Sequence, residues 1–314
     1  MTHSNGTTLE PRFSAVIPVY NCEQYIAEAI ESVLNQSWPA FEIIVVNDGS
    51  KDNTAAVVRR YSDFSTLSHT DEENQGVSAA RNRGATLARG NWIAFLDADD
   101  LWHTDKLQTF RDYILEFPRV GLFWSDMRTI NAAGHPRKRE KGRDPLAQVV
   151  FNQPVGPLPS SVVMRKDVFD QTTGFDTRLR CYEDSEFFLR VANSFPVMFI
   201  PQPLFAYRKR DKGIDHWRMR GVEESWAMAQ ESLALLYRHH PLKHKALKQR
   251  SASVYSTAGR HYLRTGNFAQ ARFCFRQSFS QRPFYWKNWR RWVLSYLPGL
   301  RGIYRRVKDH SVRS

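Results

Sequence analysis

The chain has 314 residues, 42% hydrophobic and 25% charged, with a formal net charge of +13, which is typical of a globular protein with a core of its own. It contains no run of 18 apolar residues, so we expect no membrane-spanning helix, and its polar first residues do not resemble a secretory signal. Three cysteines without metal-ligand spacing indicate a reducing compartment, and we expect a cytoplasmic protein.

The charge is unevenly distributed. Residues 1–210 carry 24 Lys and Arg against 26 Asp and Glu, whereas residues 211–314 carry 21 against 6. This contrast predicts two units with different partners. We expect a flexible N-terminus at 1–11, a large domain at 12–210 and a smaller, basic α-helical region at 211–314.

The front of the chain alternates between predicted strands and helices. Ile26–Leu34 has an amphipathic pattern, and Asn21 with Gln24 matches a helix-capping box. The other predicted strands and helices are strands 13–19, 42–47, 66–70 and 92–96, and helices 52–61, 76–88, 102–116 and 183–192. This order predicts an α/β fold with a mostly parallel sheet flanked by helices.

Two later segments break this alternation. Residues 128–158 hold prolines and the basic run 137–141, which predicts a surface loop or insertion. An apolar stripe at 222–236 predicts a helix, and residues 252–283 match one tetratricopeptide-like helical hairpin. Its matching positions are Gly259, Tyr262, Gly266, Phe268, Ala271, Phe275 and Pro283.

Carboxylates follow two of the predicted strands. Asp48 ends one strand, and Asp97, Asp99 and Asp100 end another. Ligands bind at the carboxyl ends of parallel strands, and an Asp-x-Asp turn suits Mg2+ or Mn2+. The alternative is that these are ordinary acidic turn residues.

Five motifs decide between these interpretations. In chain order they are VIPVYN (16–21), VVNDGSKDNT (45–54), NQGVSAARNRG (74–84), FLDADD (95–100) and GFDTRL with YEDSEFFLR (174–190). Together they resemble family 2 glycosyltransferases, an inverting family with a GT-A fold, over residues 12–208.

The resemblance implies a pocket for a nucleotide donor. In that pocket Asp48 would accept a hydrogen bond from the base, Gly49 would let the chain pass close by, and Arg81 would help to seat the nucleotide. The donor-binding residues implied are Pro18, Tyr20, Asn21, Glu23, Asp48, Gly49, Arg81 and Asp97.

The resemblance also implies the chemistry. Asp99, with Asp97, would bind the metal that neutralises the diphosphate leaving group. Asp184 matches the catalytic base that takes the acceptor proton, and Glu183 would orient this base or the acceptor.

Three of these residues have a second interpretation. Arg81 could be a surface residue of its helix, and Glu183 with Asp184 could simply be an acidic first helical turn. Arg208 could meet a phosphate, but the prediction is a solvated arginine, and the residue is left out of the site.

The implied activity is transfer of a sugar from a nucleotide-diphosphate donor, with UDP-sugar favoured, to a hydroxyl of a glycan or lipid-linked acceptor in polysaccharide or glycoconjugate synthesis. One rival is a nucleotidyltransferase, which would need a glycine-rich basic loop where the chain has Tyr20 to Glu23. Another is an inactive scaffold with a helical-repeat tail, which would have lost Asp99 or Asp184.

The C-terminal stretch 285–313 interleaves aromatic residues with cations. This pattern suits the headgroup layer of an anionic membrane, and we expect peripheral contact with the cytoplasmic membrane face. The alternative is a basic helix whose tryptophans pack on the core. No nucleic-acid partner is expected, because no recognised motif occurs. The residues concerned are Trp286, Trp289, Trp292, Tyr296, Tyr304, Lys287, Arg290, Arg291, Arg301, Arg305 and Arg306.

Overall fold

The computed structural model describes residues 10–136, 157–179 and 183–209, together with parts of 252–296. The sequence divides into two compact units. One is formed by residues 1–150 and 155–213, and the other almost entirely by residues 214–314.

Several sequence-based predictions lie outside the described residues. They concern the N-terminal residues 1–9, the basic run 137–141, the apolar stripe 222–236 and, in the basic aromatic stretch, Trp286, Lys287, Arg290 and the residues beyond 296.

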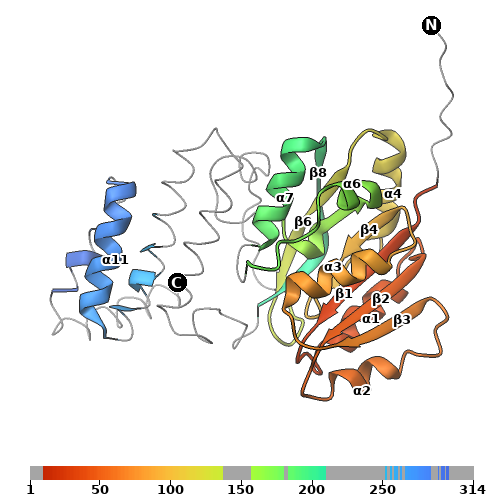
Figure 1. Ribbon diagram of the computed structural model, residues 1–314, viewed down its shortest axis with the longest axis horizontal. Helices are drawn as coiled ribbons and strands as arrows, with labels where there is room; N and C mark the ends of the chain where they lie inside the picture. The colour runs from red at the N-terminus through yellow and green to blue at the C-terminus, as the bar shows by residue number, and fades with distance from the viewer. Residues whose placement is uncertain are drawn as a thin grey trace, which may run out of the picture. The chain divides into compact units, whose positions relative to one another are not determined.

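The larger unit is built on a mixed eight-stranded sheet in the order β3-β2-β1-β4-β7-β6-β8-β5 (Figure 1). The four strands from β3 to β4 are parallel, β7 is antiparallel to both neighbours, β6 and β8 are parallel, and β5 is antiparallel to β8. The strands are β1 (Phe13–Val19), β2 (Glu42–Asp48), β3 (Leu67–Glu72), β4 (Trp92–Phe95), β5 (Leu101–Trp102), β6 (Leu122–Ile130), β7 (Val162–Arg165) and β8 (Val197–Arg208).

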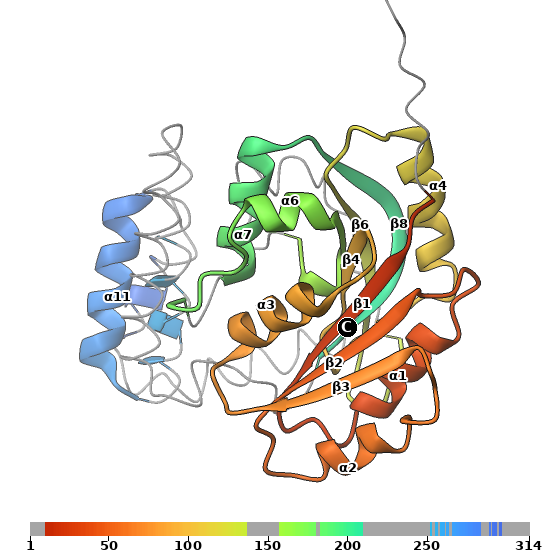
Figure 2. The ribbon, with the colours of Figure 1, turned by 45° about the vertical axis from the view of Figure 1, so that its right-hand side comes forward.

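Helices cover both faces of this sheet. The core on one face holds side chains of α1, α2 and α4, and the core on the other holds side chains of α3, α6 and α7 (Figure 2). The helices are α1 (Ile26–Leu34), α2 (Thr54–Arg59), α3 (Val77–Leu87), α4 (Lys106–Glu116), α6 (Lys166–Gln171) and α7 (Glu183–Ser194), with a short 3-10 turn η2 (Pro159–Ser161). The α/β prediction is confirmed, whereas strands β5, β6, β7 and β8 are not among the predicted strands.

The central strand β1 shows why the predicted strands form. All seven of its residues are buried, as expected where both sheet faces are covered. Pro18 has no N–H to donate to a neighbouring strand. The pairing of β1 with β4 already ends at Val16, so the proline breaks no hydrogen bond to β4. The helix expected from Trp102 begins only at Lys106, because Leu101 and Trp102 pair with β8 as β5.

Helix α3 lies unusually close to the sheet. A Cβ added at Gly84 would lie 2.3 Å from Val16 Cγ1, so only glycine allows this approach. The neighbouring Arg81 is consequently held near the ends of β1 and β4 as a buried side chain.

In the smaller unit, α11 (Phe268–Gln281) follows a turn at Gly266, where φ is +88°. Ala271 and Phe275 are fully buried, and a Cβ at Gly259 would lie 2.8 Å from the Phe275 ring. The tetratricopeptide-like assignment of this segment stays a prediction. Among the described helices, none has the length and apolar character needed to cross a membrane.

Candidate active site

Hydrogen bonds join the loop after β1 to the loop after β2. Asn21 has a left-handed φ of +46°, its Oδ1 accepts from Lys51 N–H at 2.7 Å, and its own N–H donates to Ser50 Oγ at 3.0 Å. The predicted capping of α1 by Asn21 is therefore wrong: α1 begins at Ile26, and its N-cap, Tyr25, makes no side-chain capping bond.

Three further bonds join the same two loops. Cys22 N–H donates to Thr54 Oγ1 at 2.8 Å, and Glu23 N–H donates to Asp52 Oδ2 at 3.2 Å. Glu23 Oε2 accepts from Asn53 N–H at 2.8 Å. Glu23, predicted as a donor-binding residue, therefore has hydrogen-bond partners within the protein.

Asp48 and Gly49 form the turn at the end of β2. The two Asp48 carboxylate oxygens accept the N–H groups of Gln75 and Gly76, at 2.7 and 2.9 Å, so Asp48 anchors the chain that enters α3. Gly49 has a φ of +71°, and a Cβ there would lie 2.9 Å from Asn74 N. Glycine is required at this position, and backbone amides occupy part of the accepting capacity of Asp48.

Hydrogen bonds to Ser160 fix the acidic turn after β4. Ser160 Oγ accepts from Asp97 N–H at 3.0 Å and donates to Asp100 Oδ2 at 2.6 Å. Asp100 is buried, and this burial, followed by the nearby Asp99 and Asp97 carboxylates, raises the pKa of Asp100 well above its ordinary value. Asp97 and Asp99 stay partly exposed, so the turn buries one carboxylate and presents two.

Arg208, at the end of β8, completes this support, and the prediction that it is solvated is wrong. Its side chain has no exposed surface. Its backbone N–H donates to Asp100 Oδ1 at 2.9 Å, and its guanidinium donates to the Asp99 and Ala132 carbonyls and to Glu28. Sequence reasoning missed this role of Arg208 because Glu28 and Asp99 are 180 and 109 positions away.

Arg81 joins the acidic turn to the first turn of α7. Its guanidinium donates to Asp97 Oδ1 at 2.8 Å and to Glu183 Oε1 at 3.0 Å. The alternative of a surface arginine is wrong, since only 5% of the side chain is exposed. Burial acts to lower the pKa of Arg81, but the carboxylates of Asp97, Glu183 and Asp184 raise it above its ordinary value.

The structure therefore brings together the end of β4 and the start of α7, as the sequence motifs required. Asp184 lies close enough to act electrostatically on Arg81, which also holds Asp97. Pro18 and Tyr20, at the end of β1, lie beside the Asp48 turn of the neighbouring strand β2.

The acidic turn offers oxygen ligands, although no group of three His, Cys, Asp or Glu side chains suited to a metal occurs within the described residues. One oxygen of Asp97 pairs with Arg81, and 29% of the Asp97 side chain is exposed. Two partly exposed carboxylates fit a cation such as Mg2+ or Mn2+ that keeps waters and shares a phosphate ligand.

The chain resembles known proteins in both sequence and fold. The family model described as Glycosyl transferase family 2 matches residues 14–211. The amylovoran biosynthesis glycosyltransferase AmsB of Erwinia amylovora is 31% identical over 208 residues, 62% of this chain and 69% of that protein. The chain spans less than half the length of other curated relatives, 44%, 17% and 31% of three of them.

Two solved structures share the fold. S. aureus TarS 1–349, in complex with UDP-GlcNAc, superimposes with a TM-score of 0.60 at 20% identity, over 86% of this chain and 81% of that 1–349 chain. The mannosyltransferase PcManGT of Pyrobaculum calidifontis, in complex with GDP-Man and Mn2+, gives 0.56 at 18% identity, over 93% and 88%. Because the family model matches more than half of the chain, this protein belongs to glycosyl transferase family 2.

Proposed function

We propose that this chain transfers a sugar from a nucleotide-diphosphate donor, a UDP-sugar, to a hydroxyl of a glycan or lipid-linked acceptor, with inversion at the sugar. The observation that carries the proposal is the pair of bonds from Arg81 to Asp97 and Glu183. They hold the acidic turn, suited to a cation that binds a donor phosphate, beside the turn that bears Asp184.

Asp184 is the proposed base. An acceptor hydroxyl is a poor nucleophile, and a carboxylate that takes its proton typically accelerates such a step by ~10²–10⁴-fold. Glu183 pairs with Arg81 and so orients the first turn of α7. A base on the sugar face opposite the leaving diphosphate gives direct displacement, hence inversion.

The donor pocket is proposed to lie over the carboxyl ends of β1, β2 and β4. Pro18, Tyr20 and Asn21 would line the nucleotide site, with Gly49 allowing close approach. Asp48, whose oxygens hold two backbone amides, would meet the base with its remaining lone pairs.

Asp99 and Asp97 would hold the divalent cation, Mg2+ or Mn2+. When bound, such a cation supplies charge neutralisation of the departing diphosphate. The contribution of the chain is the fixed position of the turn, through Ser160, Arg208 and the buried Asp100.

The comparisons support this proposal at the level of chemistry. TarS binds UDP-GlcNAc and PcManGT binds GDP-Man with Mn2+ on the same fold, and AmsB is named for amylovoran biosynthesis. By extension, we place this chain in polysaccharide or glycoconjugate synthesis. Family membership argues against a nucleotidyltransferase, and the presence of Asp99 and Asp184 argues against an inactive scaffold.

Release of free nucleoside diphosphate from a panel of sugar donors, with and without Mn2+, tests the activity. Asp184→Asn should bind UDP by calorimetry and lose transfer, whereas Asp99→Ala should lose the Mn2+-supported part of UDP binding. Asp112→Asn, an exposed carboxylate on α4, is the matched control. Turnover that ignores Mn2+, or no turnover with any donor, would contradict the proposal.

We further propose that the smaller unit contacts an anionic membrane surface. Trp292 packs on the buried cluster of that unit, as the alternative interpretation required. Trp289 and Tyr296, however, are each 47% exposed, and Arg272 stacks on the Tyr296 ring at 4.8 Å. Exposed aromatics beside cations suit the headgroup layer.

Sedimentation with vesicles tests this contact. The protein should bind phosphatidylglycerol vesicles and not phosphatidylcholine vesicles, and Trp289→Ser with Tyr296→Ser should weaken binding. Phe64→Ser, an equally exposed aromatic in the larger unit, is the control. Equal binding by all variants would contradict the proposed surface.

A further inference from the structure

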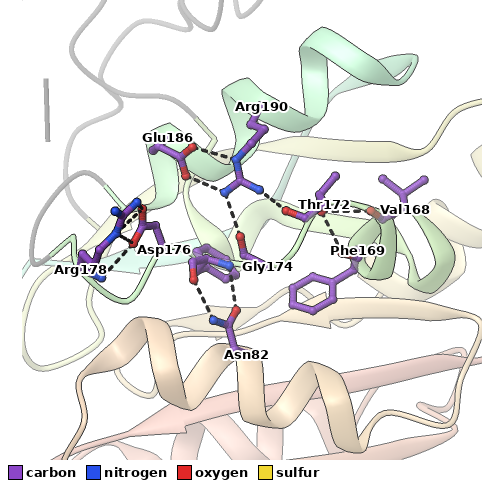
Figure 3. A network of polar contacts seen from close by, with 10 residues as sticks. Asn82, Val168, Phe169, Thr172, Gly174, Asp176, Arg178, Glu186 and Arg190 are labelled. Carbon is purple, nitrogen blue, oxygen red and sulfur yellow. Dashed lines mark hydrogen bonds and ion pairs between the residues drawn. The ribbon is translucent and has the colours of Figure 1, made fainter. Parts of the chain in front are cut away.

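One side chain of α3 ties down the segment that leads into α7. Asn82 Nδ2 donates to the Phe175 carbonyl and Asn82 Oδ1 accepts from the Phe175 N–H, both at 2.8 Å. Figure 3 shows Asn82 reaching from α3 to this segment. Two reciprocal bonds to one residue fix both the position and the direction of the backbone there.

The same segment is held from its other side by α7 itself. Arg190 donates to the Thr172 carbonyl and, at 2.9 Å, to the Gly174 carbonyl (Figure 3). Glu186, one turn earlier on α7, binds the Arg190 guanidinium at 2.7 and 2.8 Å. We call Asn82, Glu186 and Arg190 the loop clamp.

The backbone inside the loop clamp adopts an unfavourable conformation. Thr173 and Gly174 both have positive φ, +61° and +70°, and the first is β-branched. A Cβ at Gly174 would lie 2.5 Å from Asn82 Oδ1. Such a conformation persists only where the surroundings impose it, which is what the clamp does.

The Phe175 ring extends the clamp into the candidate active site. It lies 4.3 Å from the Phe187 ring of α7 and 5.4 Å from the Phe95 ring, two residues before Asp97. The Arg81 guanidinium lies over it at 5.3 Å. Phe175 thus contacts the helix that carries Asp184, the strand that ends two residues before Asp97, and the arginine that joins the two turns.

We propose that Asn82 and Arg190 are positioning residues that fix the base-bearing turn of α7 against the donor site before any substrate binds. This inference rests on the proposed function, in which Asp184 is the base. Neither residue touches the reacting atoms. They act through the segment 172–176. Its displacement would move the turn that bears Asp184, whereas the donor-side turns keep their own bonds from Gln75 and Gly76 to Asp48 and from Asp97 to Ser160.

The test compares Asn82→Leu, which keeps the branched shape of the side chain and removes both bonds, with Arg83→Ala. Arg83 is the next residue of α3 and makes an exposed pair with Glu72, so its loss controls for a change on the same helix. Since a displacement of about 1 Å can cost ~10²-fold, Asn82→Leu should lower kcat by roughly 10–100-fold. Donor KM and UDP affinity should change by less than about threefold.

A second readout needs no substrate. Hydrogen exchange of peptides covering 172–186 should accelerate in Asn82→Leu and stay unchanged in Arg83→Ala, with α3 and β4 protected in both. Arg190→Lys is the second variant. It keeps an ion pair with Glu186 and loses the fork that reaches two carbonyls, so it should reproduce the kcat loss even if Asn82→Leu folds poorly.

Three outcomes overturn the inference: full kcat in folded Asn82→Leu and Arg190→Lys, a parallel loss of kcat and UDP binding, or unchanged exchange over 172–186. These are distinguishable from failure of the proposed function. If the proposed function were wrong, the wild-type protein itself would show no transfer, or Asp184→Asn would retain transfer.

Discussion

Replacing Lys106 by methionine should change how the stability of the larger unit depends on pH. Lys106 is fully buried, and Nζ makes one long hydrogen bond, 3.3 Å, to the Ser161 carbonyl. The Phe110 and Trp102 rings lie 4.2 and 5.4 Å from Nζ, and no carboxylate of the described residues acts on Lys106. Burial lowers the pKa of Lys106 well below its ordinary value of 10.5.

The sign follows from proton counting. Between the lowered pKa and 10.5 the folded protein holds a neutral amine, while the unfolded chain holds an ammonium. The unfolded state binds one more proton, so the free energy of unfolding rises by about 1.4 kcal/mol per pH unit. As the pH approaches 10 from below, the wild-type protein should therefore gain stability relative to Lys106→Met, by up to about 1.4 kcal/mol for each pH unit.

Hydrogen exchange of α4 and β4 peptides, measured in both proteins at each pH, gives this difference for the larger unit alone. Lys51→Met, at an exposed lysine, is the control and should follow the wild type. A stability difference between wild type and Lys106→Met that is constant over this range, or that changes with the opposite sign, would refute the reasoning.

Three further substitutions test the support of the site. Gly84→Ala should destabilise by about 1–3 kcal/mol through the clash with Val16, and Val16→Ala should restore part of it, as thermal unfolding would show. Ser160→Ala removes a bond to the buried Asp100 and should cost about 1–3 kcal/mol, with UDP affinity as a second readout. Arg81→Met leaves two carboxylates unpaired and should cost about 3–5 kcal/mol, against a smaller loss for Arg81→Lys; equal losses for the two would count against the ion pairs.

The fold was predictable where local patterns and tertiary structure agree. Continuous apolar runs closed by Pro18 or Asp48 mark buried strands. Strand β8 was missed because Pro201 and Pro203 suggest a break. In the structure its register against β6 shifts on both sides of Asp126, opposite Pro203, and this irregularity accommodates the prolines.

The separate segments of the site were predictable from the sequence, whereas the contacts between those segments were less predictable. The motifs identified the acidic turn and the start of α7, whose contacts with Arg81 span 16 and 102 positions. Burial of Arg208 and the bonds of Asn82 to Phe175 depend on which elements meet in space. No periodicity or turn chemistry within one segment encodes that information.

The hydrogen bonds between the loops after β1 and β2 affect how the proposed nucleotide site could be engineered. Five bonds cross between these loops, two of them at Asn21, and each uses a backbone N–H of one loop and a side chain of the other. Each loop therefore depends on side chains of the other loop for its conformation. A chimera intended to recognise another nucleotide should therefore exchange both loops as a pair, because a single graft would leave several amides facing the wrong side chains.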